Sequence, residues 1–178
     1  MDILSVLKQE HRAVSALIDQ VQQCEPDDPQ LDELAKKIEQ ELSVHAELEE
    51  KIFYPELRDR AEESDERVDV FEAYTEHEVV KHLIALLKSG RKRDELFKAE
   101  LQVLGENVKH HVKEEESTIF SLARELLERE ELDELGERFE QGKARMMSRA
   151  SANGRRTGSR KKSSAKRSGR TKKTSRSR

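Results

Sequence analysis

Four long stretches of the chain repeat apolar residues every three or four positions, and this spacing constrains the fold more than any other feature. The repeat gives a helix one apolar face, which must be buried against other helices. We predict helices over residues 2–23, 29–60, 64–90 and 94–126, and a shorter one over residues 131–146. Pro26 and Pro29 separate the first two, Pro55 should kink or interrupt the second, and Gly90 should close the third.

Helices of this length, joined by short loops, predict an all-α fold, an antiparallel up-down-up-down four-helix bundle over residues 1–146. The short fifth helix should cap one end of the bundle. Charged residues make up 40% of the chain, and only 3 Pro and 7 Gly interrupt it, which favours long amphipathic helices over a sheet. No Gly-rich phosphate loop, Ser-His-Asp order or CxxC pair occurs, and the single Cys24 excludes an intramolecular disulfide.

The start of the chain lacks the basic residues and long apolar run of a signal peptide. No apolar stretch approaches the roughly 20 residues that span a bilayer. We therefore expect a cytoplasmic protein without a membrane partner.

Charge divides the chain into two parts. Residues 143–178 hold 15 of the 34 Lys and Arg and none of the 38 Asp and Glu, which leaves residues 1–142 with a net charge of −19. Residues 147–178 consist mostly of Arg, Lys, Ser, Gly, Thr and Ala without an apolar run, so we expect a disordered basic tail. Its charge suits phosphate backbones, and residues 148–178 are a candidate segment for non-specific nucleic-acid binding. A tail that serves solubility, or folds back on the acidic part, is the alternative.

Histidines and glutamates interrupt the apolar faces of the four long helices. Glu49 follows His45 by four residues, and Glu115 follows His111 by four, which puts each pair on one helix face about one turn apart. Imidazole and carboxylate groups directed at one point suit a divalent first-row metal, and bundle cores build such sites from facing helices. The candidate metal ligands are His11, His45, Glu49, His77, His111 and Glu115.

Two other interpretations stay open. If the apolar faces are rotated by one residue, Glu49 and Glu115 point to solvent. Alternatively, the inward polar residues hydrogen-bond one another in a purely structural bundle. An unpaired buried carboxylate costs several kcal/mol, so an inward glutamate favours a bound cation.

The motifs in the four long helices resemble the hemerythrin or HHE cation-binding domain. The resemblance covers residues 2 to about 128 and rests on KQEHR at 8–12, HAELEE followed by IFYP at 45–55, EHE at 76–78, and HHVKEEE followed by IF at 110–120. It implies a bundle around a non-haem di-iron centre, with two iron ions as cofactors. Glu49 and Glu115 are then candidate bridging ligands, the four histidines bind terminally, and an open coordination position accepts O₂, peroxide or nitric oxide. Zinc and manganese suit the same ligands.

The chain departs from the oxygen-carrying hemerythrins. Lys81 stands where those proteins have a second third-helix histidine, and His82 is one residue out of phase. Their last carboxylate is an Asp five residues after its histidine, a position held here by Glu116, which a π-bulge would select over Glu115. His110, also out of phase, is predicted to be a flanking surface residue.

These departures favour iron–oxygen redox chemistry over reversible O₂ carriage. The functions implied are oxidative-stress handling, including catalase-like turnover of peroxide, or sensing of iron or a gas. Tyr74, one turn before His77, is close enough in sequence to approach the metal, but we expect it to be a tyrosine of the core or its boundary. The competing hypothesis is a nucleic-acid-associated protein in which the bundle is a sensor or scaffold.

Overall fold

The computed structural model describes residues 1–87 and 94–167, with side chains as far as residue 149. The chain forms two compact units, Met1–Lys143 and Ala144–Arg178. Every regular element in the described ranges is helical, which confirms the predicted all-α class.

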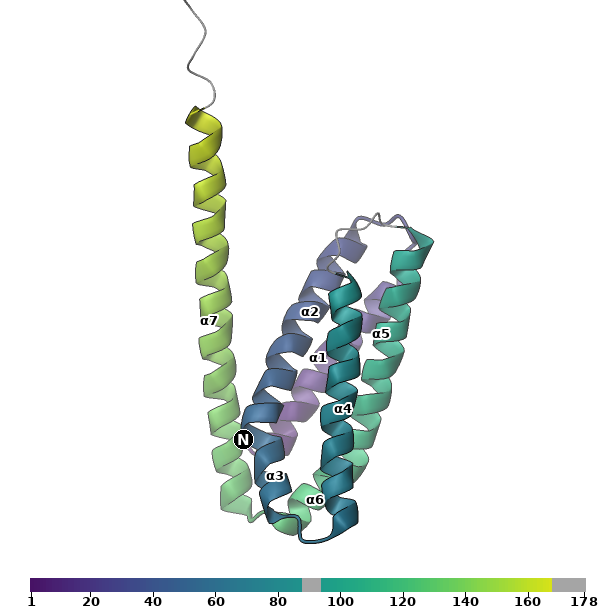
Figure 1. Cartoon of the computed structure of the whole chain (residues 1–178), viewed down its shortest axis with the longest axis vertical. Helices are drawn as coiled ribbons and strands as arrows, with labels where there is room; N and C mark the ends of the chain where they lie inside the picture. The colour runs from purple at the N-terminus through teal and green to yellow at the C-terminus, as the bar shows by residue number, and fades with distance from the viewer. Residues whose placement is uncertain (88–93, 168–178) are drawn as a thin grey trace, which may run out of the picture. The chain divides into compact units, whose positions relative to one another are not determined.

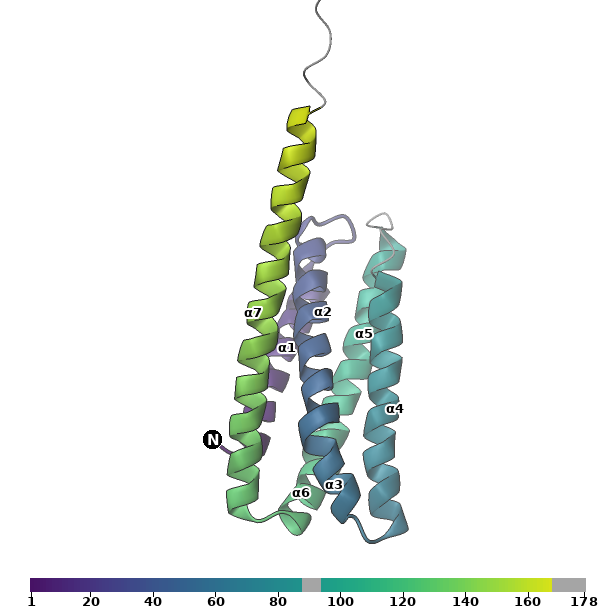
Figure 2. The same ribbon diagram turned by 60° about the vertical axis from the view of Figure 1, so that its left-hand side comes forward.

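The first unit is built on four long helical rods that run side by side (Figures 1 and 2). The bounds are α1 (Ile3–Gln23), α2 (Gln30–Leu48), η1 (Glu49–Phe53), α3 (Tyr54–Arg60), α4 (Ser64–Leu87), α5 (Glu95–Glu114), η2 (Glu115–Ile119) and α6 (Phe120–Leu126). Here η1 and η2 are single π-helical turns, through which α2 continues into α3 and α5 into α6. Helix α1 packs against α2 and α5, and α4 packs against α5 and α2, as in the predicted bundle.

Two aspartates fix the starts of long helices. The Asp2 carboxylate accepts the N–H of Ser5 at 3.0 Å, and the Asp94 carboxylate accepts the N–H of Phe97 at 3.2 Å. Each satisfies a backbone donor that the first helical turn leaves free. The starts of α1 and α5 are therefore set by local sequence.

The core has two apolar parts. One gathers residues toward the loop between α1 and α2, including Val14, Ile18, Ile38 and Leu104. The other lies toward α3 and α6 and contains Phe53, Tyr54, Leu57, Phe120 and Phe139, all fully buried. The predicted metal ligands occupy the helix positions between these two parts.

Helix α7 (Arg129–Arg167) contributes its first residues to the Met1–Lys143 unit. A Cβ added at Gly136 would lie 2.1 Å from the carbonyl oxygen of Met1, so α7 approaches the N-terminus closely there. The Lys143 ammonium pairs with the carboxylates of Glu10 and Glu41, the latter at 2.8 Å. These contacts join α7 to α1 and α2.

The predicted boundaries agree with the structure except in α7. The second predicted helix is interrupted just before Pro55, as expected, and Gly90 lies outside the described residues. The predicted short fifth helix is wrong in length, because α7 continues past Met146 to Arg167. Its Arg, Lys and Ala are good helix formers, and no proline stops it. Tail disorder stays a prediction, and residues 168–178 lie outside the described ranges. No described helix is long and apolar enough to cross a membrane.

Candidate metal centre

Six polar side chains are buried between the two apolar parts of the core. None exposes more than 5% of its surface, and Glu49 exposes none. They are the six residues singled out from the sequence: His11, His45, Glu49, His77, His111 and Glu115. The interpretation that turns the glutamates to solvent is therefore wrong.

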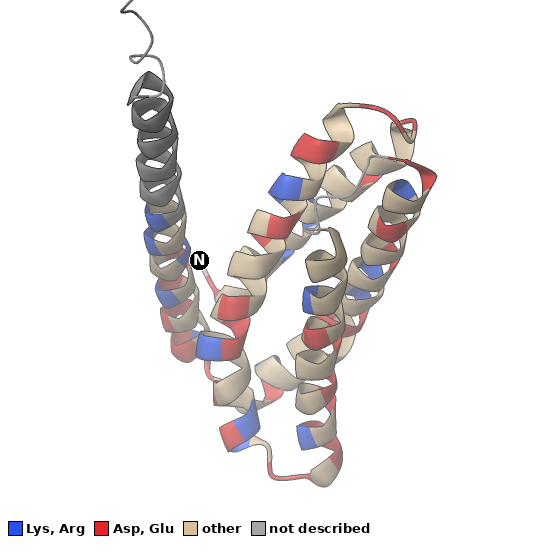
Figure 3. Ribbon diagram, turned by 45° about the horizontal axis from the view of Figure 1, so that its top comes forward, with Lys and Arg blue, Asp and Glu red and all other residues tan. Residues whose placement is uncertain are grey.

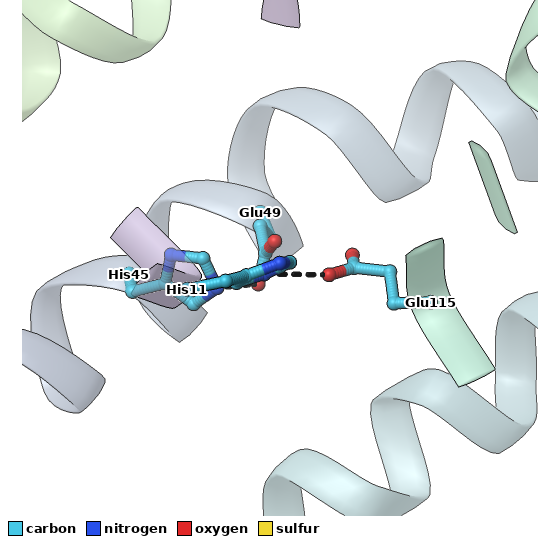
Figure 4. A group of neighbouring side chains, drawn as sticks. All are labelled: His11, His45, Glu49 and Glu115. Carbon is cyan, nitrogen blue, oxygen red and sulfur yellow. Dashed lines mark ion pairs between the residues drawn. The ribbon is translucent and has the colours of Figure 1, made fainter. Parts of the chain in front are cut away.

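One group of potential ligands joins α1 to the two π-helical turns. His11, His45, Glu49 and Glu115 each offer an atom, and these atoms lie within 4.8 Å of one another (Figure 4). His11 Nε2 is 3.1 Å from Glu115 Oε2, and His45 Nε2 is 3.1 Å from Glu49 Oε2. Two imidazoles and two carboxylates thus face one point.

A second group shares Glu49 with the first. Glu49, His77 and His111 also offer atoms within 4.8 Å of one another. His77 Nε2 lies 3.3 Å from Glu49 Oε2 and 3.1 Å from His111 Nε2. The Glu49 carboxylate therefore belongs to both groups of potential ligands.

Several ligand atoms lack a hydrogen-bond partner within the described residues. They are His11 Nε2, both oxygens of Glu49, and Glu115 Oε2. His11 Nε2 and Glu115 Oε2 are close, but their geometry is not that of a hydrogen bond. Because buried polar groups are almost always bonded, unsatisfied atoms that converge on one point fit a cation site.

Each site glutamate begins a π-helical turn. The N–H of Tyr54 donates to the carbonyl of Glu49, and that of Phe120 donates to the carbonyl of Glu115. The turns shift the phase of the residues that follow but leave each glutamate one α-helical turn after its histidine. Pro55 lies just beyond η1, whereas no proline lies near η2, so proline is not required for the turn. Such turns recur at functional sites.

The direction in which side chains point at η2 decides whether Glu115 or Glu116 belongs to the candidate metal centre. The Glu115 side chain is fully buried in the first group, whereas that of Glu116 is 33% exposed. The predicted π-bulge exists, but it begins at Glu115 and therefore does not turn Glu116 inward. Glu116 instead contacts the outer nitrogen of His11.

Carboxylates also hold the outer edges of three histidine rings. The contacts are His11 Nδ1 to Glu116 at 2.9 Å, His77 Nδ1 to Glu50 at 3.0 Å, and His111 Nδ1 to Glu76 at 2.7 Å. A proton held on Nδ1 leaves Nε2 as the inward ligand atom. The sequence indicated Glu116 only as an alternative metal ligand and did not indicate Glu50 or Glu76, although each of the three directly precedes or follows a site residue in the chain.

The site is strongly coupled electrostatically. Burial opposes charge on His11, but nearby carboxylates, Glu115 foremost, raise its pKa to about 9. Burial likewise opposes charge on His77, and carboxylates led by Glu49 raise its pKa to about 9. Burial disfavours the Glu49 carboxylate, yet His45 and His77 hold its pKa well below the ordinary value. The charged forms of these histidines and of Glu49 therefore stabilise one another.

Tyr54 is a further site residue. Its hydroxyl donates to Glu115 Oε1 at 2.9 Å and lies 3.4 Å from His77 Nε2. Burial, and then the Glu115 charge, raise the pKa of Tyr54 well above the ordinary value, so it stays protonated. Tyr74 is half-buried, as expected for a tyrosine at the boundary of the core, and its hydroxyl donates to a backbone carbonyl of η1. The π-helical turn after Glu49 is what brings Tyr54 into the site.

The remaining histidines lie at the surface, as predicted. His82 is exposed, and the His110 side chain is 65% exposed. Lys81 does not enter the centre, because its ammonium pairs with the Glu50 carboxylate at 2.7 Å.

A small apolar cavity of about 20 Å³ adjoins the histidines. Its walls include Val14, Leu42, Val80 and Val108 as well as all four site histidines. One water needs about 10–15 Å³ measured this way, so the cavity has room for a molecule of one or two heavy atoms.

Known proteins similar to this chain agree with a buried His/Glu cluster that could hold a cation. The family model described as the hemerythrin HHE cation binding domain matches residues 2–123. The chain belongs to the hemerythrin HHE cation-binding family. This HHE domain also resembles the crystal structure of a hemerythrin HHE cation binding domain-containing protein from Mycobacterium kansasii, with a TM-score of 0.69 and 22% identity. That match covers 83% of this chain and 86% of the other, and supports the fold alone.

A curated relative from Nostoc sp., named DNA nickase, is 31% identical over 150 residues. The match covers 84% of this chain but 41% of the relative, so the HHE protein spans about two fifths of that protein's length.

Proposed function

We propose that the HHE domain holds two iron ions and that this centre binds or reacts with O₂, peroxide or nitric oxide. One observation carries the proposal: Glu49 belongs to two groups of ligand atoms, and neither of its oxygens has a hydrogen-bond partner within the described residues. A bridging carboxylate would hold two cations within about 4 Å and offset their repulsion.

The ligand types support a first-row transition metal. The residues that would hold one ion are His11, His45 and Glu115, those that would hold the other are His77 and His111, and Glu49 offers an atom to both groups. Imidazole and carboxylate together suit iron, manganese and zinc. The family resemblance favours iron.

Side chains around the centre hold rings and protons in place. The carboxylates on Nδ1 orient three imidazoles, which typically strengthens metal binding. The Tyr54 hydroxyl stays protonated and donates a hydrogen bond to Glu115 Oε1, so it can serve as a hydrogen-bond donor beside the centre. A bound di-iron pair would supply redox and Lewis-acid chemistry.

The apolar cavity supports a small, weakly polar ligand. Its walls are aliphatic apart from the histidine rings, so it would favour a diatomic gas over an ion. Lys81, in place of an additional histidine, leaves a ligand set rich in carboxylates, which fits catalase-like or other redox chemistry, or sensing, better than O₂ carriage.

Rapid mixing of the iron-loaded full-length protein with peroxide or nitric oxide tests this function. We expect a change in near-ultraviolet and visible absorption that Glu49→Gln abolishes. His82→Ala is the matched control and should keep the change, since that histidine is exposed. An unresponsive wild-type spectrum, or an equal response in Glu49→Gln, would refute the proposal.

A second candidate function is nucleic-acid association through the basic tail. Two observations favour it: residues 143–178 hold 15 Lys and Arg without an acidic residue, and a relative is named DNA nickase. The segment has no aromatic residue for base stacking, so binding would depend on phosphates and not on sequence.

Deleting residues 148–178 tests this second candidate. The full-length protein should bind duplex DNA with an affinity that falls steeply as salt rises, and the truncated protein should not. Binding that survives the deletion, or that ignores salt, would exclude the tail as the binding segment.

A further inference from the structure

An acidic cleft opens on the bundle, and one of the residues that line it, Glu115, belongs to the candidate metal centre. It lies between α4 and the α5–η2 rod, where acidic residues recur along the helices (Figure 3), and has a volume of about 80 Å³. Asp69, Glu72 and Glu76 line one side, at spacings that put them on one face of α4. Glu114 and Glu115 line the other side.

Three of these carboxylates have no cationic partner among the described residues. In the part of the chain that the structure describes, no Lys, Arg or His lies within ion-pair distance of Asp69, Glu72 or Glu114. Glu76 differs, because it pairs with His111 Nδ1 at 2.7 Å. Like charges close together repel, so the outer three acids favour a mobile cation between them.

The inner wall of the cleft is a ligand of the proposed centre. Glu115 lines the cleft although it is only 1% exposed, and its Oε2 has no hydrogen-bond partner among the described residues. A cation attracted by the outer carboxylates would therefore next reach the buried Glu115 carboxylate, which has an oxygen free to bind it. The apolar cavity beside the histidines offers no such path, because an ion in aliphatic surroundings is strongly disfavoured.

We propose that this acidic cleft is the route by which a divalent metal cation reaches the buried centre. Asp69, Glu72 and Glu114 draw the hydrated cation from solvent, and Glu115 receives it. The inference rests on the proposed metal-binding function. It adds a role for three residues outside the candidate ligand set.

Metal loading kinetics test the route with cobalt(II) as the probe. The metal-free full-length protein is mixed rapidly with cobalt(II), and the visible absorption of the bound ion is followed at several salt concentrations. Wild type is compared with the triple variant Asp69→Asn, Glu72→Gln, Glu114→Gln. The control is Asp27→Asn, Glu106→Gln, Glu125→Gln, which changes the charge equally at exposed positions outside the cleft.

We expect the cleft variant to load about tenfold more slowly at low salt, with a weaker salt dependence and the same final absorption. The control variant should load like wild type. Equal loading rates in the two variants would overturn the route. A lower final absorption at an unchanged rate would also overturn it, since the acids would then be ligands. A wild-type protein that binds no cobalt(II) would overturn the proposed centre itself.

Discussion

Glu49 is the residue on which the two-cation arrangement depends most. Glutamine in its place keeps the side-chain volume but removes the charge and one donor oxygen from both groups of ligand atoms. Glu115 contributes to one group only, and its Oε1 already accepts a hydrogen bond from Tyr54. We therefore expect Glu49→Gln to lose both ions and Glu115→Gln to keep one.

The size of the effect follows from linkage between binding and folding. An ion that binds only the folded state, supplied at about 100 times its Kd, adds about 2.7 kcal/mol to the free energy of unfolding. For a folded unit the size of Met1–Lys143, about 1 kcal/mol raises Tm by about 3–4 °C. Each ion should thus raise Tm by about 8–10 °C, and two ions by about 16–20 °C.

Differential scanning calorimetry with and without iron(II), in the absence of O₂, measures this increment. Each variant is compared with its own metal-free form, because the substitutions also change the stability of that form. Glu47→Gln is the control, since its side chain is 45% exposed and pairs with Lys51 at the surface. A full increment in Glu49→Gln, or none in Glu115→Gln, would refute the sharing of Glu49 between two cations.

Three further outcomes are expected. Glu76→Gln should weaken metal binding about 10–100-fold in a chelator competition, because it removes the carboxylate on an imidazole Nδ1; unchanged affinity would contradict that role. The pKa values of His11 and His77, raised from 6.5 to about 9, stabilise the metal-free protein fully below pH 6.5, and this stability is lost as pH rises through 9. Metal affinity should rise over the same range, since protons compete for these nitrogens. Measurements across pH 6–9 should therefore show the stability of the metal-free protein falling while its metal affinity rises. Gly136→Ala should destabilise the fold by about 1–3 kcal/mol in thermal unfolding, whereas equal stability would mean that α7 does not approach the N-terminus there.

The helical repeat was enough to predict the bundle and the six inward polar residues. Two His–Glu pairs contributed most to that prediction. His45 and Glu49, like His111 and Glu115, keep the four-residue spacing of an α-helix up to the glutamate. The family match over residues 2–123 confirms the resemblance that these motifs suggested. That the six inward polar residues bind a metal stays a prediction.

The π-helical turns explain what the sequence did not predict. A regular helical repeat continued past Glu49 leaves Tyr54 out of phase, whereas the extra residue in η1 brings its hydroxyl to Glu115. Hydrogen-bond registers of this kind depend on tertiary contacts as well as on local sequence.

The carboxylates on the outer ring nitrogens were missed for another reason. Glu50 and Glu76 are partly exposed and look like ordinary surface acids in a chain with 38 Asp and Glu, and Glu116 was considered only as a metal ligand. Only the geometry of neighbouring helices distinguishes them. The length of α7 was likewise underestimated, because the sequence after Met147 lacks the apolar repeat that predicts a helix.

Iron content per chain is the most direct test of the central claim. Full-length protein from cells supplied with iron should carry about two irons per chain, and Glu49→Gln purified alongside should carry almost none. Wild-type protein without iron, or Glu49→Gln with a full complement, would contradict a di-iron centre bridged by Glu49.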